Sequence, residues 1–292
     1  IMIKKLLLIL LCLPMIGFGQ NVNIPDANFK AYLVGNTAIN TNGDFEIQVS
    51  EATVFNGNID CSWMNIADLT GIEDFTTLTN LDCGGNQLTY LDVSNNTDLD
   101  YLFCYSNQLT SLYLGNNTHL IILACYGNPL TSLDVSQNTS LTDLNCGDNQ
   151  LTNLDVSQNT ALMYLAFGQN QLTYLDVSNN TTLTILNCPN NQLTYLDVSN
   201  NTALTNLNCG GNQLTSLDVR NGNNINFSNF ELQDNPSLTC INVDDTTWST
   251  TNWTVANSNI DIQHYFSNNC PPSAVQEHTT NKELLKVTGL LG

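Results

Sequence analysis

Basic side chains are scarce in this sequence of 292 residues. It holds 6 lysines and arginines against 26 aspartates and glutamates, which gives a formal net charge of −20. Between Lys30 and Lys282 the only basic residue is Arg220. A surface this acidic repels phosphate backbones and anionic lipid, which argues against nucleic-acid binding. The charge instead suits solubility, cationic partners or divalent metal ions.

Histidines and catalytic signatures are also scarce. The three histidines, His119, His264 and His278, lie outside any metal or nucleophile motif. The sequence contains no zinc-protease, nucleophile-elbow, phosphate-loop or dinucleotide motif. Aspartates are plentiful enough for a carboxylate pair that hydrolyses glycosides, but they recur in regular columns that define no unique cleft. We therefore predict that the protein is not an enzyme and keep a hydrolase as the minor alternative.

Long apolar runs are limited to one, Leu6–Phe18, which follows Lys4 and Lys5. It is short for a membrane helix and is typical of a secretory signal peptide, which we predict over residues 1–20. No other stretch is apolar enough to span a membrane. The sequence thus predicts a secreted or cell-surface protein.

A 21-residue repeat dominates the rest of the chain. The segment Leu193–Gln213, LTYLDVSNNTALTNLNCGGNQ, is one copy. Other copies begin at Leu88, Leu109, Leu130, Leu151, Leu172 and, in a form that decays partway, Leu214. Such a period is the signature of a repeat architecture. Leu207 and Cys209 alternate with polar or small residues, as in a strand, and a strand this short must stack on its neighbours to bury its apolar face.

The remainder of the unit predicts the fold class. Its second half, L-T-x-L-D-V-S-x-N-T, also looks extended, so strand-like backbone is expected on both sides with little helix. An asparagine recurs where each rung turns off its strand, and its side chain can bond backbone groups that the turn leaves unpaired. We predict a mainly β solenoid, a curved array of about nine rungs over residues 59–243. This asparagine column comprises Asn86, Asn107, Asn128, Asn149, Asn170, Asn191 and Asn212.

The pattern L-x-x-L-x-C-x-x-N-Q-L resembles the leucine-rich repeat family. The 21-residue length, with cysteine at one leucine position, is similar to the internalin J type of bacterial surface adhesin. The resemblance runs from about Ile59 to Val243 and implies a stacked ladder of thiols and an adhesive function.

One column of the repeat holds cysteines. Phe167 occupies the same position in one copy, which favours packing over chemistry. Neighbouring rungs lie about 4.8 Å apart, farther than the roughly 3.8 Å between Cβ atoms that a disulfide prefers. We predict buried free thiols; zinc binding is the alternative, but it needs four converging ligands that a one-dimensional stack does not provide. The column comprises Cys61, Cys83, Cys104, Cys125, Cys146, Cys188 and Cys209.

Residues 21–58 precede the repeats and are expected to cap the open end of the solenoid, with a short helix that begins at Asp26. Within them, Asn40–Glu51 resembles an EF-hand calcium loop, although Phe45 stands where the sharp turn favours glycine. Two interpretations stay open, a weak calcium site and a loop that keeps the shape of a lost site; we favour the second. The candidate calcium ligands are Asn40, Asn42, Asp44, Glu46 and Glu51.

Past Arg220 one further rung is hidden at Phe227–Asn235. Cys240 then takes an outward position, and Cys270 is its expected disulfide partner in a secreted protein. The bridge would staple a C-terminal cap over residues 244–270. Residues 271–292 look like a linker and a truncated sorting domain, similar to the type A domains of Bacteroidetes type IX secretion, which implies attachment to the outer membrane. Apolar cover for the cap is expected from Trp248, Trp253, Ile260, Ile262, Tyr265 and Phe266.

Outward strand positions of successive rungs should form a concave face. Its aromatic cluster indicates an interaction site, or else cross-strand stacking that only stabilises the sheet. On the opposite face an aspartate column could bind cations, but we favour local hydrogen bonds to each carboxylate. The ligand-face candidates are Tyr101, Phe103, Tyr105, Ile122, Tyr126 and Tyr164; the aspartate column is Asp92, Asp134, Asp155, Asp176, Asp197 and Asp218.

These features predict an adhesin-like binding protein, monomeric and without catalysis, whose partner is a protein or glycan on a cell surface. Calcium is the single candidate cofactor. The alternative function is a calcium-dependent glycan-binding or structural surface-layer protein.

Overall fold

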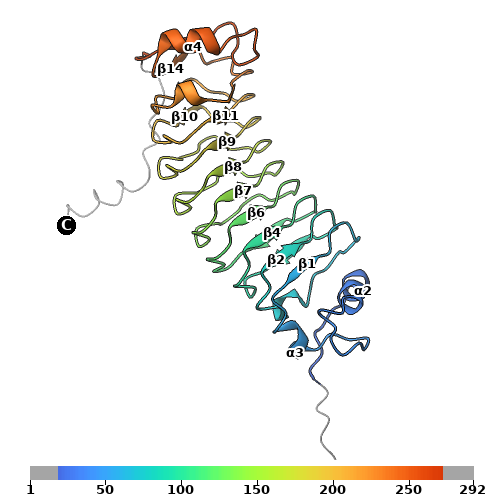
Figure 1. Cartoon of the computed structure of the whole chain (residues 1–292). Coiled ribbons are helices and arrows are strands. Elements are labelled where there is room, and N and C mark those ends of the chain that lie inside the picture. Colours follow the sequence, from blue (N-terminus) through green and yellow to red (C-terminus); the bar gives the residue numbers. More distant parts are fainter. Residues whose placement is uncertain (1–18, 272–292) are drawn as a thin grey trace, which may run out of the picture.

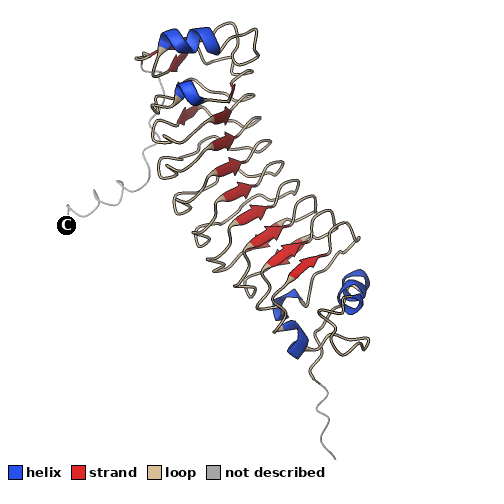
Figure 2. Cartoon of the chain, in the orientation of Figure 1, coloured by secondary structure: helices blue, strands red, loops and turns tan. Residues whose placement is uncertain are grey.

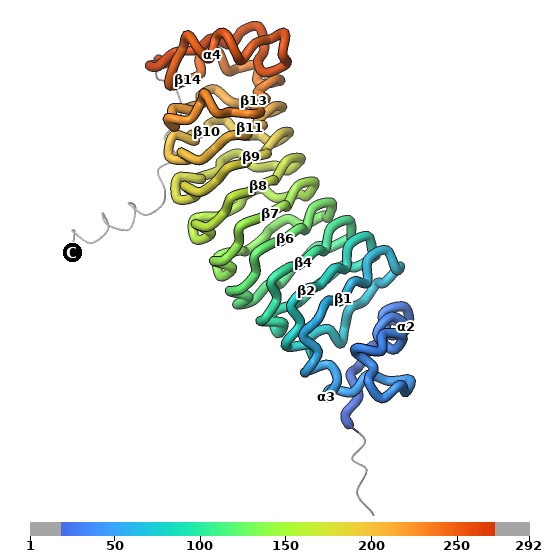
Figure 3. Tube along the Cα trace, viewed as in Figure 1, coloured from blue at the N-terminus to red at the C-terminus, as the bar shows by residue number. Residues whose placement is uncertain are grey.

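The computed structural model describes residues 19–271 as a gently curved stack of rungs (Figure 1). The chain runs once around each rung before it rises to the next, as the tube in Figure 3 shows. The predictions of a signal peptide over residues 1–20 and of a sorting domain over residues 271–292 lie almost wholly outside the described residues.

One parallel sheet of nine strands runs along the solenoid, and each strand is three residues long. Neighbouring strands pair in register, so the central residue of one strand lies beside the central residue of the next, as Leu144 lies beside Leu165. The central residues are buried because they point into the solenoid. In spatial order the strands are β1 (Asn58–Asp60), β2 (Asn80–Asp82), β4 (Tyr101–Phe103), β6 (Ile122–Ala124), β7 (Asp143–Asn145), β8 (Tyr164–Ala166), β9 (Ile185–Asn187), β11 (Asn206–Asn208) and β13 (Asn229–Glu231).

The opposite side of the rungs is extended but pairs only near the two ends of the stack (Figure 2). A two-stranded sheet joins β3 (Tyr90–Asp92) to β5 (Ser111–Tyr113). Four more strands form a second sheet near the C-terminal end. They are β10 (Tyr195–Asp197), β12 (Ser216–Asp218), β14 (Cys240–Asn242) and β15 (Tyr265–Ser267).

Helices lie only outside the regular rungs of the described chain. The N-terminal helix α2 (Ala27–Gly35) begins at Asp26, whose carboxylate accepts the backbone N–H groups of Asn28 and Phe29 at 2.9 and 3.0 Å. Phe29 and Leu33 from this helix are buried in the same core as the first rungs, as expected for a cap. The remaining helical segments are α3 (Val49–Ala52), α4 (Thr246–Asn252) and the 3₁₀ turns η1 (Ile72–Asp74) and η2 (Asn224–Asn226).

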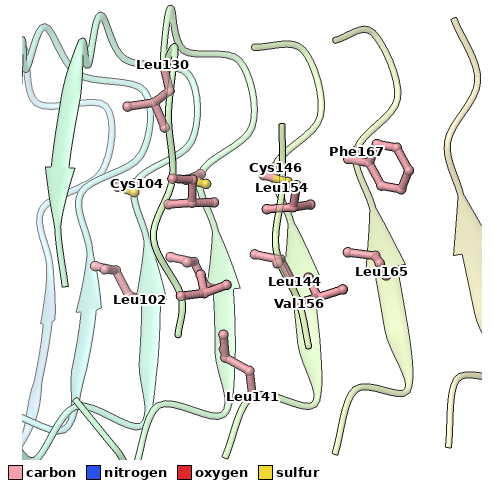
Figure 4. Close-up of a cluster of buried hydrophobic side chains, with 14 of the residues drawn as sticks. Leu102, Cys104, Leu130, Leu141, Leu144, Cys146, Leu154, Val156, Leu165 and Phe167 are labelled. Atoms are coloured by element: carbon pink, nitrogen blue, oxygen red, sulfur yellow. The ribbon is translucent and has the colours of Figure 1, made fainter. Parts of the chain in front are cut away.

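The core is a continuous column of leucines with cysteines beside them (Figure 4). Leu144 and Leu165 enter it from the main sheet, and Leu154 and Val156 from the opposite side. The seven cysteines of the predicted ladder are free and buried, which confirms the cysteine ladder. Phe167 is buried in the same column and fills the position of one thiol.

Two asparagine ladders link successive rungs. The first ladder is the column predicted from the sequence, extended by Asn235: each amide nitrogen donates to carbonyl groups of its own and the preceding rung. The second ladder was not predicted. Its members are fully buried, and each donates its amide nitrogen to backbone carbonyls of the rung before it. They are Asn96, Asn117, Asn138, Asn159, Asn180 and Asn201.

The C-terminal end is closed by the predicted Cys240–Cys270 disulfide and by aromatic packing. Trp253 stacks on Phe230 with ring centroids 4.0 Å apart. Two of the expected cap residues do not cover the core: Ile262 is 89% exposed and Tyr265 is 51% exposed. Tyr265 pairs with the outward residue Cys240, whereas its neighbour Phe266 takes the inward register of the strand.

Candidate functional site

The predicted ligand face is the solvent side of the nine-stranded sheet. We call it the main-sheet face: the first and third residues of each strand and the two residues after the column cysteine. The register places Tyr101 beside Ile122, and Asp143 between Ile122 and Tyr164. Five of the six candidates are half-buried and Tyr126 is exposed. The structure therefore brings the predicted residues onto one face, with Tyr164 separated from the others by the rung of Asp143.

A stacked aromatic pair on this face joins two neighbouring rungs. Tyr105 and Tyr126 stack with ring centroids 5.1 Å apart and planes within 6°. Each occupies the position directly after a column cysteine. Most other rungs carry glycine at this position, so the stacked pair distinguishes these two rungs from the rest.

Trp63 belongs to the same face and was missed by the sequence analysis. It is 68% exposed, and its φ of 59° is left-handed, a conformation that bulky residues rarely adopt. A Cβ placed on Gly85 would lie 2.2 Å from Cδ2 of Trp63, so the indole lies over this glycine. Trp63 stands two residues after Cys61, where Gly85 and Gly127 stand after their own cysteines. Comparison of that column across the repeats would have singled it out.

Tyr105 leans toward Trp63 across the same rung. A Cβ placed on Gly84 would lie 2.5 Å from Cζ of Tyr105, so the phenol ring covers Gly84 as the indole covers Gly85. The two side chains are close enough for Trp63 to act on the pKa of Tyr105, which it lowers against the larger effect of burial. The paired glycines of this rung thus allow aromatic rings from the rungs on either side to meet.

Two carboxylates lie beside these rings. Asp60 and Asp82 are in-register partners on β1 and β2. The pKa of Asp82 lies above its ordinary value, chiefly because the carboxyl is partly buried. The Gly84 N–H, which donates to this carboxylate at 2.9 Å, lowers the pKa, and the negative charge of Asp60 raises it further. Burial, followed by the charge of Asp82, likewise raises the pKa of Tyr105. This end of the main-sheet face therefore carries a concentrated negative field.

The aspartate column on the opposite side is engaged in local hydrogen bonds. Each carboxylate accepts a backbone N–H two residues on, as Asp134 accepts from Ser136 at 2.9 Å. The last member, Asp218, also forms an ion pair with Arg220. Near this column a depression of about 290 Å³ is lined by Asp68, Glu73, Tyr90, Asp92 and neighbouring residues. The same backbone contact recurs at Asp92, Asp155, Asp176, Asp197 and Asp218.

The EF-hand-like loop does bring its five candidate residues together, but their oxygen atoms bond within the cap. Glu51 accepts the backbone N–H groups of Thr41 and Gln48 at 2.8 and 3.0 Å. Asn40 accepts from Gly43 and turns its amide nitrogen to backbone carbonyls. In this arrangement side-chain oxygens of Asn40, Asn42, Asp44 and Glu51 already accept hydrogen bonds within the cap. The side-chain oxygens of Asn42 and Asp44 accept the backbone N–H groups of Asp44 and Glu46 at 2.9 and 2.8 Å. Glu46, whose expected ligand atom is its backbone carbonyl oxygen, pairs its side chain with Lys30.

His264 is a buried histidine near the C-terminal end of the solenoid. Burial lowers the pKa of His264, whose ring accepts the backbone N–H of Asp261 at 3.1 Å. Within residues 19–271 no three histidine, cysteine or acidic side chains are grouped to hold a metal ion. No helix in the same range has the length and apolar character needed to cross a membrane.

Comparisons with known proteins relate the chain to bacterial leucine-rich repeat proteins. The functional domain of internalin J from Listeria monocytogenes, described as including a cysteine ladder, is 36% identical with a TM-score of 0.53. The match covers 78% of this chain and 58% of that chain, so this chain spans less than two thirds of the relative's length.

More distant structures support the fold alone. An internalin C2 from Listeria monocytogenes is 19% identical with a TM-score of 0.57, over 77% of this chain and 96% of that one. A leucine-rich repeat protein from Leptospira interrogans is 20% identical with a TM-score of 0.54, over 77% and 70% of the two chains. Residues 152–187 match the LVIVD repeat family. A search of curated proteins finds no match. The fold is thus a leucine-rich repeat solenoid with a cysteine ladder.

Proposed function

We propose that this protein is an adhesin-like binding protein that acts outside the cell and recognises a macromolecular partner through its main-sheet face, without catalysis. The observation that carries the proposal is the group of half-exposed aromatic side chains on the central rungs of that face. Exposed aromatic groups on a soluble protein commonly mark an interaction site. The likeness to the internalin J domain supports the same function.

The rigidity of the scaffold suits this function. Both asparagine ladders join neighbouring rungs through buried hydrogen bonds, and the core runs without interruption from α2 to the C-terminal cap. A face held this firmly loses little conformational entropy on binding, which favours affinity. In this proposal the protein is monomeric, and the predicted signal peptide and sorting domain deliver it to the outer membrane.

A binding screen against surface proteins and glycans tests the proposal. The variant Tyr101→Ala/Phe103→Ala/Tyr105→Ala removes the aromatic group from the main-sheet face. A matched control is Tyr90→Ala/Tyr113→Ala, which removes an exposed aromatic pair, 5.5 Å apart, from the opposite side. We expect binding to be lost in the triple variant and retained in the control, with both variants folded by circular dichroism.

The opposite result would contradict the proposal. Binding that survives the triple variant, or that is lost only in the Tyr90/Tyr113 control, would move the site to the other side of the rungs. Turnover of a polysaccharide in the same screen would overturn the non-catalytic part of the proposal.

A further inference from the structure

The N-terminal end of the main-sheet face combines negative charge with exposed aromatic surface. We call this group the acidic–aromatic end; it consists of Asp60, Trp63, Asp82 and Tyr105. The two carboxylates lie on adjacent strands in register, and the two rings meet over the glycines of the β2 rung. Tyr126 stacks on the outer side of this group and extends the aromatic surface to the next rung.

The two carboxylates are only partly engaged by the protein. Oδ1 of Asp60 accepts from the backbone and hydroxyl groups of Ser62 at 3.2 and 2.7 Å, and Oδ1 of Asp82 accepts the Gly84 N–H at 2.9 Å. Within residues 19–271 no hydrogen bond reaches Oδ2 of either residue, and no lysine or arginine pairs with them. Two in-register carboxylates therefore repel each other on this surface without a compensating cation.

The aromatic side chains supply the second half of a cation site. A guanidinium or ammonium group is attracted to the face of a tryptophan or tyrosine ring within about 6 Å of its centroid. Trp63 stands at the left-handed turn position that recurs after each strand of the main sheet, and most of its side chain is exposed.

We propose that the acidic–aromatic end binds a cationic segment of a partner protein, with arginine side chains placed between the carboxylates and the rings. This inference rests on the proposed function, since it names the partner chemistry for one part of the same face. Arginine suits the site better than lysine because its planar guanidinium stacks on aromatic rings and can bond two carboxylate oxygens at once. The net charge of −20 favours encounter with such a segment.

Charge decides between a cationic peptide and other ligands. A neutral glycan stacked on Trp63 and Tyr105 would remove water from Asp60 and Asp82 without offsetting their charge, which is costly. Calcium needs six to eight oxygen ligands, and this pair of aspartates supplies few of them. A cationic side chain uses both the carboxylates and the rings.

The test is a titration with a capped peptide of alternating arginine and glycine. Its control is the same peptide with citrulline, a neutral analogue of arginine. Binding is followed by calorimetry and by the fluorescence of Trp63, the exposed tryptophan, because Trp253 is buried and Trp248 partly buried. We expect Asp60→Asn/Asp82→Asn to weaken binding of the arginine peptide about tenfold, because the variant removes two surface ion pairs between the protein and the peptide.

A matched variant separates the site from general electrostatic attraction. Asp134→Asn/Asp155→Asn makes the same change in net charge on the opposite side, where each carboxylate also accepts a local backbone N–H. Binding by this variant should stay within about twofold of the parent protein. Trp63→Gly removes the indole and suits the left-handed backbone, so it should weaken binding while the melting temperature is unchanged or higher.

The inference is overturned if the two aspartate double variants weaken binding equally, since binding would then follow net charge alone. It is also overturned if the citrulline peptide binds as tightly as the arginine peptide. The proposed function is judged by the Tyr101/Phe103/Tyr105 triple variant, and the cationic partner by Asp60→Asn/Asp82→Asn, which leaves every ring of the face in place. If the triple variant loses binding to a partner that Asp60→Asn/Asp82→Asn still binds, the main-sheet face is supported as the binding site and the proposal of a cationic partner is overturned.

Discussion

Asn107 reaches back to Leu88 on the preceding rung, where its side-chain oxygen accepts the Leu88 backbone N–H at 3.0 Å. Its amide nitrogen donates to the Cys83 carbonyl at 3.0 Å, so one side chain satisfies a donor and an acceptor that the turn leaves unpaired. The same arrangement recurs along the first ladder, for example at Asn149. The second ladder differs: the side-chain oxygens of its members are buried without a hydrogen-bond partner among the described residues.

This difference predicts unequal costs for the two ladders. In Asn149→Ala a buried N–H of Leu130 and three carbonyl groups lose their partner, and we expect a loss of about 3 kcal/mol in the free energy of unfolding. In Asn159→Ala only carbonyl groups lose a partner, and an unsatisfied buried oxygen is removed as well, so the loss should be about 1 to 2 kcal/mol. Urea denaturation measures both losses, provided that the two variants share the same dependence of the free energy of unfolding on urea. Equal losses would contradict the different roles assigned to the two ladders.

The left-handed turn after each strand predicts a stabilising substitution. Gln169 has a φ of 57°, a conformation that glycine adopts without strain. Gln169→Gly should therefore raise the free energy of unfolding by about 0.5 to 1 kcal/mol, since relief of the strain outweighs the added freedom of the unfolded chain. The control is Gln171→Gly, an exposed position without a positive φ, which should be destabilising by a similar amount. Thermal denaturation of both variants decides the sign.

The thiol ladder predicts that the solenoid loses stability in alkaline solution. Burial raises the pKa of Cys125 and of Cys209 to about 12. Because the pKa is raised in the folded state, the stability that each buried neutral thiol contributes is complete below the pKa of the unfolded thiol, about 8.5. That stability is lost as pH rises through the pKa of the folded state. Each buried thiol then removes about 1.4 kcal/mol of stability for each pH unit in that window.

Substitution of one thiol should reduce this pH dependence. In Cys125→Ala the free energy of unfolding should fall less steeply with rising pH than in the parent protein, because one fewer thiol ionises on unfolding. Leu144→Ala serves as a control, since it should lower stability by about 2 to 5 kcal/mol at every pH and leave the slope unchanged. If both variants keep the parental slope, the thiols do not titrate on unfolding.

The N-terminal cap depends on an ionised Glu51. Burial raises the pKa of this carboxyl, but hydrogen bonds from Gln48, Thr41 and Asn42 outweigh it, so the pKa lies below its usual 4.5. The stability that it contributes is therefore complete above about pH 4.5 and is lost as pH falls through the lower folded value. Glu51→Gln should lower the melting temperature at neutral pH and weaken the acid dependence, as thermal scans across this range would reveal.

Calcium provides the contrasting experiment on the same loop. Because the loop oxygens already bond within the cap, we predict no rise in the melting temperature when calcium is added and no fall with a chelator. A calcium-dependent rise that disappears in Glu51→Gln would instead support the calcium-dependent alternative function. The two results are distinguished in a single series of thermal scans.

Much of the fold could be predicted because a sequence that repeats must adopt nearly the same local structure in every copy. Once Leu207 and Cys209 are recognised as strand residues, every other copy must follow, and stacking in register places the thiols and Asn212 in columns. The Cys240–Cys270 disulfide could also be predicted, because Cys240 occupies an outward position of a recognisable rung. The exposed cap residue Ile262 was misjudged because the irregular end has no repeat to define its register.

The sequence by itself determined the period, the inward and outward positions and the acidity of the whole chain, since these depend on residues close together or on composition. Only the tertiary structure decided that Trp63 and Tyr105, 42 positions apart, meet over a glycine rung beside Asp60 and Asp82. That meeting depends on a left-handed turn at Trp63 and on the absence of side chains at Gly84 and Gly85. Local periodicity says which way a residue faces, but not which neighbour its side chain leans toward once the rungs are stacked.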